Sequence, residues 1–175
     1  MEKKIVMISL FGAVVLAALI AGIIALKKND LTVLNRDHTW YVEYDTGTGK
    51  DLLVRGSKIK AVRGDINKMI IALNKTTSEA EASNAQKEGV PLEPPKMRLQ
   101  GVVAEGIAHV EIINAEYLTQ RMGTSGAQNY LAAATYSLTE MPGVRRVDFI
   151  FPEGDHAAPG VYTRESFRDY AVKAQ

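Results

Sequence analysis

An uninterrupted apolar run near the N-terminus constrains the fold of this chain more than any other feature. Residues 5–26 carry no charged side chain, and Ser9 supplies the only hydroxyl group among them. About twenty apolar residues, at about 1.5 Å of helix each, span the hydrocarbon core of a bilayer. Because a single segment can cross lipid only as a helix, the sequence predicts one transmembrane helix within a membrane anchor of residues 1–28.

The residues around this run indicate that the anchor is retained. A cleaved signal peptide has about 7–15 apolar residues before a small-residue cleavage site, whereas this run is longer and ends in Leu26-Lys27-Lys28. A cleaved signal is the alternative. The lysines on the two sides nearly balance, so the short N-terminal tail decides the expected orientation. We expect a single-pass protein of the cytoplasmic (inner) membrane, with its N-terminus inside and its C-terminal domain extracytoplasmic.

Small side chains recur every four residues along the predicted membrane helix. They are Ser9, Ala13, Ala17, Ala21 and Ala25. Small residues at this spacing let two helices approach closely in lipid, which favours a helix-packing face and an oligomer. The alternative is that alanine is simply common in such helices.

The composition of the rest of the chain excludes several kinds of site. The formal net charge is +1 and no basic run occurs beyond residue 28, which argues against a nucleic-acid partner. The chain has no cysteine, so thiolate nucleophiles, disulfides, iron–sulfur clusters and cysteine-ligated zinc are excluded. No motif points to a cofactor, and none is expected.

The first part of the domain has patterns typical of two strands and a helix. Residues 39–45 and 52–62 are rich in β-branched and aromatic side chains and predict two strands around a glycine turn. Asp65 can cap the following helix, whose apolar residues recur at helical spacing over 66–73. Residues 74–96 are rich in Ser, Thr, Ala, Glu and Pro and predict a long loop.

The second part repeats strands and helix in another order. Residues 98–113 predict a hairpin that turns at Gly106. Residues 127–141 have an apolar face at helical period, and the Pro-Gly pair that follows ends the helix. Residues 144–151 predict a strand, and residues 166–172 a short helix.

These elements predict an α+β fold. Helices interleaved with a mostly antiparallel sheet give a two-layer α/β sandwich behind the N-terminal transmembrane helix. We expect a linker at 29–38, one domain at 39–154 that includes the long loop, and a C-terminal extension at 155–175.

Two groups of residues suggest catalysis or metal binding, and both have a simpler reading. Residues 45–48 read Asp-Thr-Gly-Thr, which resembles the active-site triplet of aspartic proteases, but the glycines there suit a hairpin turn. Glu153, Asp155 and His156 follow the last predicted strand, where carboxylates and imidazole can bind metal or move protons. The prolines and glycine around them favour an exposed turn with solvated charges. We therefore expect neither an enzyme nor a metal site.

One stretch of sequence resembles a known domain family. Residues 137–144 read Ser-Leu-Thr-Glu-Met-Pro-Gly-Val and are followed by Val147. This resembles the GerMN domain of sporulation and spore-germination proteins, in which a helix ends in a Thr-Leu-Thr-like triplet, an acidic residue and Pro-Gly before a Val-rich strand. Upstream, residues 108–114 are similar to a family strand but lack its Asp and Ser, and Glu153-Gly154 stands where the family has Asp-Gly.

The resemblance implies assembly and no catalysis. Domains of this family look like the ring-building motifs of membrane-spanning complexes, and no catalytic residue belongs to the family pattern. The leading hypothesis is a non-enzymatic interaction module of an envelope-spanning complex, which associates with itself or docks to another envelope protein. Tyr130 and Tyr136 lie off the apolar stripe of their helix and are candidate interface residues; covering nearby loop residues is their alternative role.

Two other functions stay open from the sequence. The runner-up is a domain that binds cell-wall glycan or a peptide through the loops around Thr124 and Glu153. The third is an envelope hydrolase that depends on Asp45, Glu153 or His156.

Overall fold

The computed structural model describes residues 38–59, 65–88 and 97–173, with the side chains of 78–88 excepted. The described residues belong to one compact unit, Asn35–Gln175. The predicted membrane helix and its five small residues, from Ser9 to Ala25, lie outside the described residues. Within the described ranges, no helix combines the length and the apolar character needed to cross a membrane.

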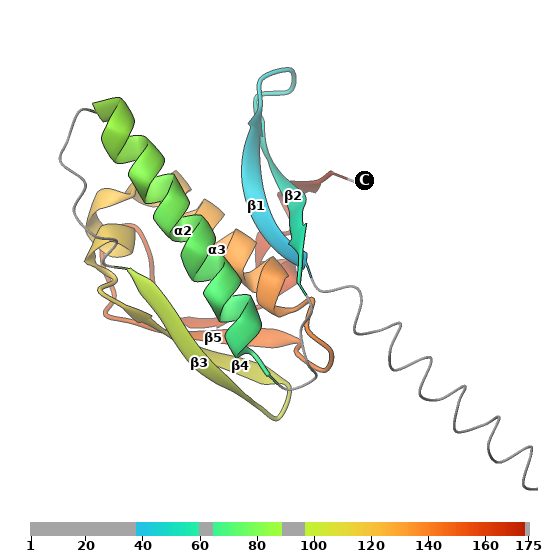
Figure 1. Ribbon diagram of the computed structural model, residues 1–175. Coiled ribbons are helices and arrows are strands. Elements are labelled where there is room, and N and C mark those ends of the chain that lie inside the picture. The colour runs from blue at the N-terminus through green and yellow to red at the C-terminus, as the bar shows by residue number, and fades with distance from the viewer. Residues whose placement is uncertain (1–37, 60–64, 89–96, 174–175) are drawn as a thin grey trace, which may run out of the picture. The chain divides into compact units, whose positions relative to one another are not determined.

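A four-stranded sheet forms one layer of the fold (Figure 1). Its strands, in spatial order, are β3 (Arg98–Ala104), β4 (Ile107–Ile113), β5 (Arg146–Ile150) and β6 (Gly160–Tyr162). β4 and β5 are parallel, and the other two pairs are antiparallel. The predicted hairpin is confirmed: β3 and β4 are joined through Glu105 and Gly106, whose φ values of 51° and 77° match the turn that two-residue hairpins prefer.

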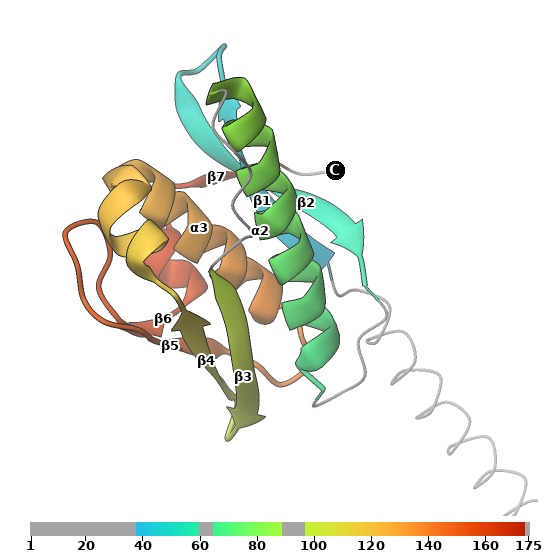
Figure 2. The ribbon, with the colours of Figure 1, turned by 60° about the vertical axis from the view of Figure 1, so that its left-hand side comes forward.

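Two helices cover the same face of this sheet, as Figure 2 shows for α2 (Asn67–Glu88) and α3 (Gly123–Leu138). A short π-helix, η1 (Tyr117–Arg121), leads into α3. The core between helices and sheet is apolar and almost fully enclosed; its largest members include Met69, Leu118, Leu131, Leu138, Val110, Val147 and Phe149. The predicted helix stripe from Ala127 to Met141 therefore faces the core.

The first two strands belong to a second sheet, which corrects the expectation of a single sheet in a two-layer sandwich. β1 (His38–Asp45) and β2 (Lys50–Lys58) form an antiparallel hairpin, and β7 (Ala171–Val172) joins β2 in parallel. β1 packs on α3, which the four-stranded sheet also contacts. Buried Ala132, Thr135 and Ser137 explain this: they lie off the apolar stripe yet are small enough to bury a second face of α3. The α+β class is confirmed.

The predicted loop at 74–96 is also wrong over most of its length, because α2 continues to Glu88. Ala, Glu, Gln and Lys dominate residues 79–88 and favour helix, whereas the first proline comes only at position 91. The predicted cap is confirmed: the Asp65 carboxylate accepts a hydrogen bond of 3.0 Å from the N–H of Asn67. Asn74 lies within the helix, and its amide bonds both the N–H and the C=O of Leu99 on the free edge of β3, at 2.8 and 3.0 Å.

The C-terminal region differs from the short helix expected at 166–172. A 3-10 helix, η2 (Arg164–Phe167), is followed by strand β7. Thr163 and Ser166 form a capping box that fixes this turn, and buried Phe167 attaches it to the core. Lys173 then donates its N–H to the carbonyl of Leu53, so the chain end pairs with β2 and does not continue as a helix.

Candidate functional site

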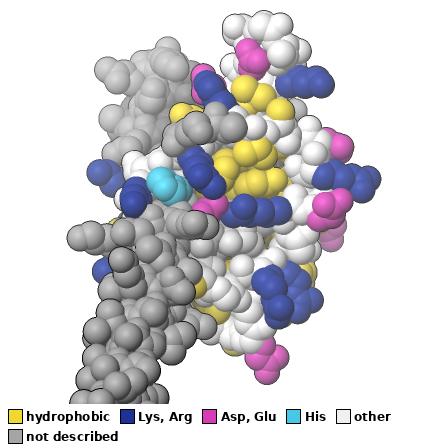
Figure 3. Space-filling view, turned by 90° about the vertical axis from the view of Figure 1, so that its right-hand side faces the viewer, with side chains coloured by type: hydrophobic (Ala, Val, Ile, Leu, Met, Phe, Trp, Pro, Cys, Tyr) yellow, Lys and Arg dark blue, Asp and Glu magenta, His cyan; other side chains and the backbone are white. Residues whose placement is uncertain are grey.

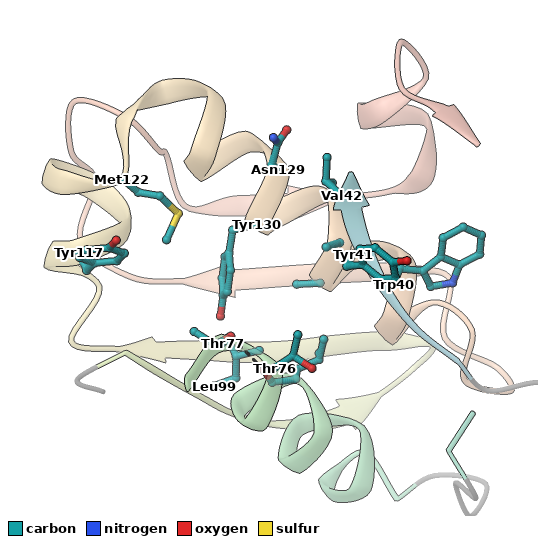
Figure 4. Close-up of a pocket in the computed structure, with 13 residues that line it drawn as sticks. Trp40, Tyr41, Val42, Thr76, Thr77, Leu99, Tyr117, Met122, Asn129 and Tyr130 are labelled. Atoms are coloured by element: carbon teal, nitrogen blue, oxygen red, sulfur yellow. Dashed lines mark hydrogen bonds between the residues drawn. The ribbon is translucent and has the colours of Figure 1, made fainter. Parts of the chain in front are cut away.

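The described domain has an apolar cavity of about 280 Å³ between β1, α2 and α3. We call it the β1 groove. Val42 lines it from β1, Thr76 and Thr77 from α2, and Tyr130 and Ala133 from α3. Figure 4 shows the Tyr130 ring pointing from α3 toward Thr77, with Tyr117 and Met122 at one end of the cavity and β1 at the other.

The two threonines make an apolar wall because their hydroxyl groups are turned inward. Thr76 Oγ1 donates to the carbonyl of Ala72 at 3.1 Å, and Thr77 Oγ1 donates to that of Leu73 at 3.0 Å. Both bonds run back one turn along α2. The threonine hydroxyls are thus satisfied within the helix, which leaves their methyl groups as the main contact surface for the groove.

The amide in the wall, Asn129, is also held by internal partners. Its Nδ2 donates to Asp51 Oδ2 at 3.1 Å, and its Oδ1 accepts from the Tyr170 hydroxyl at 2.6 Å. Burial, and then the charge of Asp51, raise the pKa of Tyr170, so the phenol stays protonated and remains a donor. These bonds link α3 to β2 and to the C-terminal region and fix the position of the wall.

Next to the groove, the end of α3 forms a dense polar cluster. We call Trp40, Arg55, Tyr136, Glu140 and Arg164 the Glu140 hub. The carboxylate of Glu140, whose side chain is only 9% exposed, accepts bonds from Trp40 Nε1 at 3.2 Å and Arg164 Nη2 at 2.9 Å. Arg55 approaches the same oxygen at 3.9 Å. The hub thus ties β1, β2 and η2 to the end of α3.

Aromatic contacts complete the hub. The Trp40 and Tyr136 rings meet edge to face with centroids 5.3 Å apart. The Arg164 guanidinium lies 4.8 Å from the Tyr136 ring centroid and donates to the Tyr136 carbonyl and to Thr139 Oγ1. Tyr136 is therefore buried against its own chain, and the exposure on which its predicted interface role depended is not found. Tyr136 lies off the main apolar stripe of α3, but that side of the helix faces the second sheet and not solvent.

Tyr130 has a different position from the one expected. It lies off the core stripe, as the sequence indicated, but it is half-buried and lines the β1 groove. The candidate interface is therefore the whole β1 groove, of which Tyr130 is one lining residue. The sequence did not single out Thr76 and Thr77, because residues 74–96 were expected to form a loop. The helix-forming composition of residues 79–88 was the signal that could have found them.

The protease-like triplet forms the tip of the β1–β2 hairpin. Asp45 Oδ2 accepts from Thr48 Oγ1 at 2.7 Å, and Oδ1 accepts from the N–H of Gly47 at 2.9 Å. These bonds from Thr48 and Gly47 hold the pKa of Asp45 below its usual range. The carboxylate lies in solvent and closes a turn, as the glycines indicated.

The loop with Glu153, Asp155 and His156 packs against η1 and α3. His156 Nδ1 lies 3.2 Å from Thr124 Oγ1, and its N–H donates to the carbonyl of Thr119. Gly154 permits the close packing, since a Cβ there would lie 2.5 Å from Thr119 Cβ. Among the described residues, no group of three acidic or histidine side chains is placed to hold a metal ion.

The other two histidines bond within the domain. His109 Nδ1 lies 3.0 Å from Asp148 Oδ2 on the neighbouring strand, on the face of the four-stranded sheet turned away from the helices. His38 Nδ1 lies 3.3 Å from the carbonyl of Gly56 across the β1–β2 hairpin.

The hairpin carries a second apolar surface, on its outer face. Tyr41, which is 41% exposed, is opposite the buried Val54 in the register, and half-buried Leu52 lies two residues along on the same side. Figure 3 shows hydrophobic side chains gathered on this side of the molecule, with Lys and Arg side chains around them. At its border Lys173 Nζ lies 3.6 Å from Glu43 Oε2.

A comparison with known proteins gives one match. A family model described as "Germane: Sporulation and spore germination" matches residues 14–151, which include the described elements from β1 to β5. No curated protein and no solved structure matches the chain. The matched range contains both the β1 groove and residues 137–147, on which the resemblance to a sporulation and spore-germination domain was based.

Proposed function

Because the chain belongs to the sporulation and spore germination family, we propose that it is a membrane-anchored, non-enzymatic interaction module of an envelope-spanning complex. In this proposal residues 1–28 anchor the protein in the cytoplasmic (inner) membrane, and the domain stands outside the cytoplasm. The domain is of the GerMN type, similar to ring-building motifs. It docks to another envelope protein or to further copies of itself.

The observation that carries the proposal is the chemistry of the β1 groove. The polar groups of Thr76, Thr77 and Asn129 form hydrogen bonds within the domain, so these residues offer mainly apolar contact area in the groove. Such a surface gains free energy when its apolar groups are covered, and none of its described lining residues is Asp, Glu, His, Lys or Cys. It suits a protein partner better than a glycan, which needs hydrogen-bonding groups, and this favours docking over the binding of cell-wall glycan.

A membrane tether strengthens weak docking. Confinement to the membrane raises the effective concentration of the domain near its partner, so weak contacts can suffice. The isolated domain is then expected to bind its partner weakly, whereas the anchored protein assembles. The small-residue face from Ser9 to Ala25 supplies a further contact within lipid.

Crosslinking of the full-length protein in membranes tests the proposal. We expect a crosslinked species, to a partner or to the protein itself, that weakens when Ala17 and Ala21 are changed to Leu. Val15→Ala and Leu19→Ala, which change side-chain size at two positions off the small-residue stripe, are the control and should leave it intact. If full-length protein in membranes gives no crosslinked species, the assembly function fails and ligand binding becomes the better account.

A further inference from the structure

We propose that the β1 groove binds an extended, uncharged segment of a partner protein, which adds as a strand to the free edge of β1 at Val42. This inference rests on the proposed function, since it names the surface and the kind of partner for docking. Strand addition combines main-chain hydrogen bonds with pockets for alternate side chains.

The backbone of Val42 faces the free edge of β1. Val42 is opposite Leu53 in the hairpin, and the Leu53 carbonyl accepts from the N–H of Lys173 on the far side of β2. In antiparallel strands, opposed residues alternate between pairs bonded to each other and pairs whose N–H and C=O groups point outward. The main-chain N–H and C=O of Leu53 face outward toward β7. Those of Val42 therefore face outward on the other side of the hairpin, toward the groove.

A second hydrogen bond confirms which β1 residues direct their main-chain groups away from β2, and it limits where an added strand can begin. The N–H of Trp40, two residues before Val42, leaves the same edge and donates to Ser137 Oγ at 2.7 Å. α3 thus closes the edge at Trp40. Among the described residues, no hydrogen-bond partner meets Val42 on that edge. An added strand can therefore bond to β1 at Val42 and continue toward the hairpin tip, while the cavity beside Val42 takes its side chains.

The electrostatic character of the groove selects an uncharged occupant. None of the thirteen described residues that line it is charged. A charged side chain would lose its hydration there without meeting an opposite charge, which is strongly unfavourable. Aliphatic and threonine side chains complement the methyl groups of Thr76, Thr77 and Ala133 instead.

The cavity is large enough for a few side chains of an extended partner segment. Its volume of about 280 Å³ lies just below the range of about 300–1,000 Å³ that is typical of small-molecule pockets. One face of an extended strand presents alternate side chains, so a short segment can place its inward-facing residues in the cavity. The outward residues stay in solvent.

The test uses full-length protein in lipid nanodiscs and a phage-displayed library of random heptapeptides. We expect enrichment of peptides with uncharged aliphatic or β-branched residues at alternate positions. Ala133→Leu, which fills the cavity, should weaken the enriched peptides by about tenfold or more in fluorescence anisotropy. Val42→Pro, which removes the edge N–H but suits an edge strand, should weaken them by about threefold to tenfold.

Gln128→Leu is the matched control, since it adds the same side chain to an exposed position of α3 outside the groove. It should leave affinity within about twofold of the unaltered protein. The inference is overturned if no peptide is enriched over empty nanodiscs, or if the enriched peptides bind all three variants equally. If membrane crosslinking then still finds a partner, the groove assignment fails and the docking function stands.

Discussion

The end of α3 and its middle meet the same strand, β1, in opposite ways. At the end, the Glu140 hub joins Trp40 to a carboxylate, two arginines and a tyrosine ring. In the middle, Ala133 and Tyr130 leave a cavity beside Val42. The two regions meet at Trp40, which belongs to the hub and also lines the groove, and Ser137 of α3 bonds to its N–H there.

The difference indicates that the hub stabilises the fold, whereas the groove offers a contact surface. Residues from β1, β2 and η2, far apart in the sequence, reach the hub, and its charged groups satisfy one another. The polar groups of Thr76, Thr77 and Asn129 in the groove wall are bonded within the domain, and no element of the described chain fills the space. Residues 137–140, in the stretch that resembles the GerMN pattern, thus hold the second sheet in place, and the groove beside them is left for a partner.

The largest expected effect is on the hub. Glu140→Ala should lower the free energy of unfolding by about 2–3 kcal/mol, because Trp40 Nε1 and Arg164 lose a nearly buried charged partner. Chemical denaturation measures this. Glu165→Ala is the control: its ion pair with Arg168 is exposed, so the change should stay within about 0.5 kcal/mol. Equal effects for the two variants would mean that the hub does not hold the fold.

Ser137, where the hub and the groove meet, should have an intermediate effect. Ser137→Ala leaves the buried N–H of Trp40 without its acceptor and should cost about 1–2 kcal/mol in the same measurement. Ser125→Ala, at an exposed position in the first turn of α3, should change stability by less than about 0.5 kcal/mol. No loss for Ser137→Ala would show that α3 does not close the β1 edge at Trp40.

The smallest effect on stability is expected in the groove. Ala133→Leu adds apolar volume to existing space at a half-buried position, so unfolding should change by less than about 1 kcal/mol. A loss of about 2 kcal/mol or more would indicate a tightly packed site and contradict an open groove. Together the three variants should give a falling series of stability effects along α3 from hub to groove.

Local sequence signals predicted the parts of the fold that depend on neighbours in the chain. The Asp65 cap, the turn at Gly106 and the apolar stripe of α3 each follow from residues within one or two turns of each other. The second sheet could not be predicted in this way. The position of this sheet depends on whether small residues such as Ala132 and Ser137 face solvent or another layer. The helical periodicity of apolar residues does not distinguish these two cases.

The candidate site was harder to predict for the same reason. Tyr130 and Tyr136 both lie off the apolar stripe, yet Tyr136 is buried in the hub and Tyr130 lines the groove. Glu140 belonged to the family-like stretch, but its partners Trp40 and Arg164 come from opposite ends of the domain. Their pairing follows from the tertiary fold and has no signature in local sequence.

The most direct test of docking through the groove places a photo-crosslinking amino acid at Thr77 in the full-length protein and irradiates native membranes. We predict one crosslinked species at this position, lost when Ala133→Leu is added, and none from the same probe at Gln128 on the exposed side of α3. A Thr77 probe that gives no crosslinked species, or one that persists unchanged with Ala133→Leu, would contradict the account.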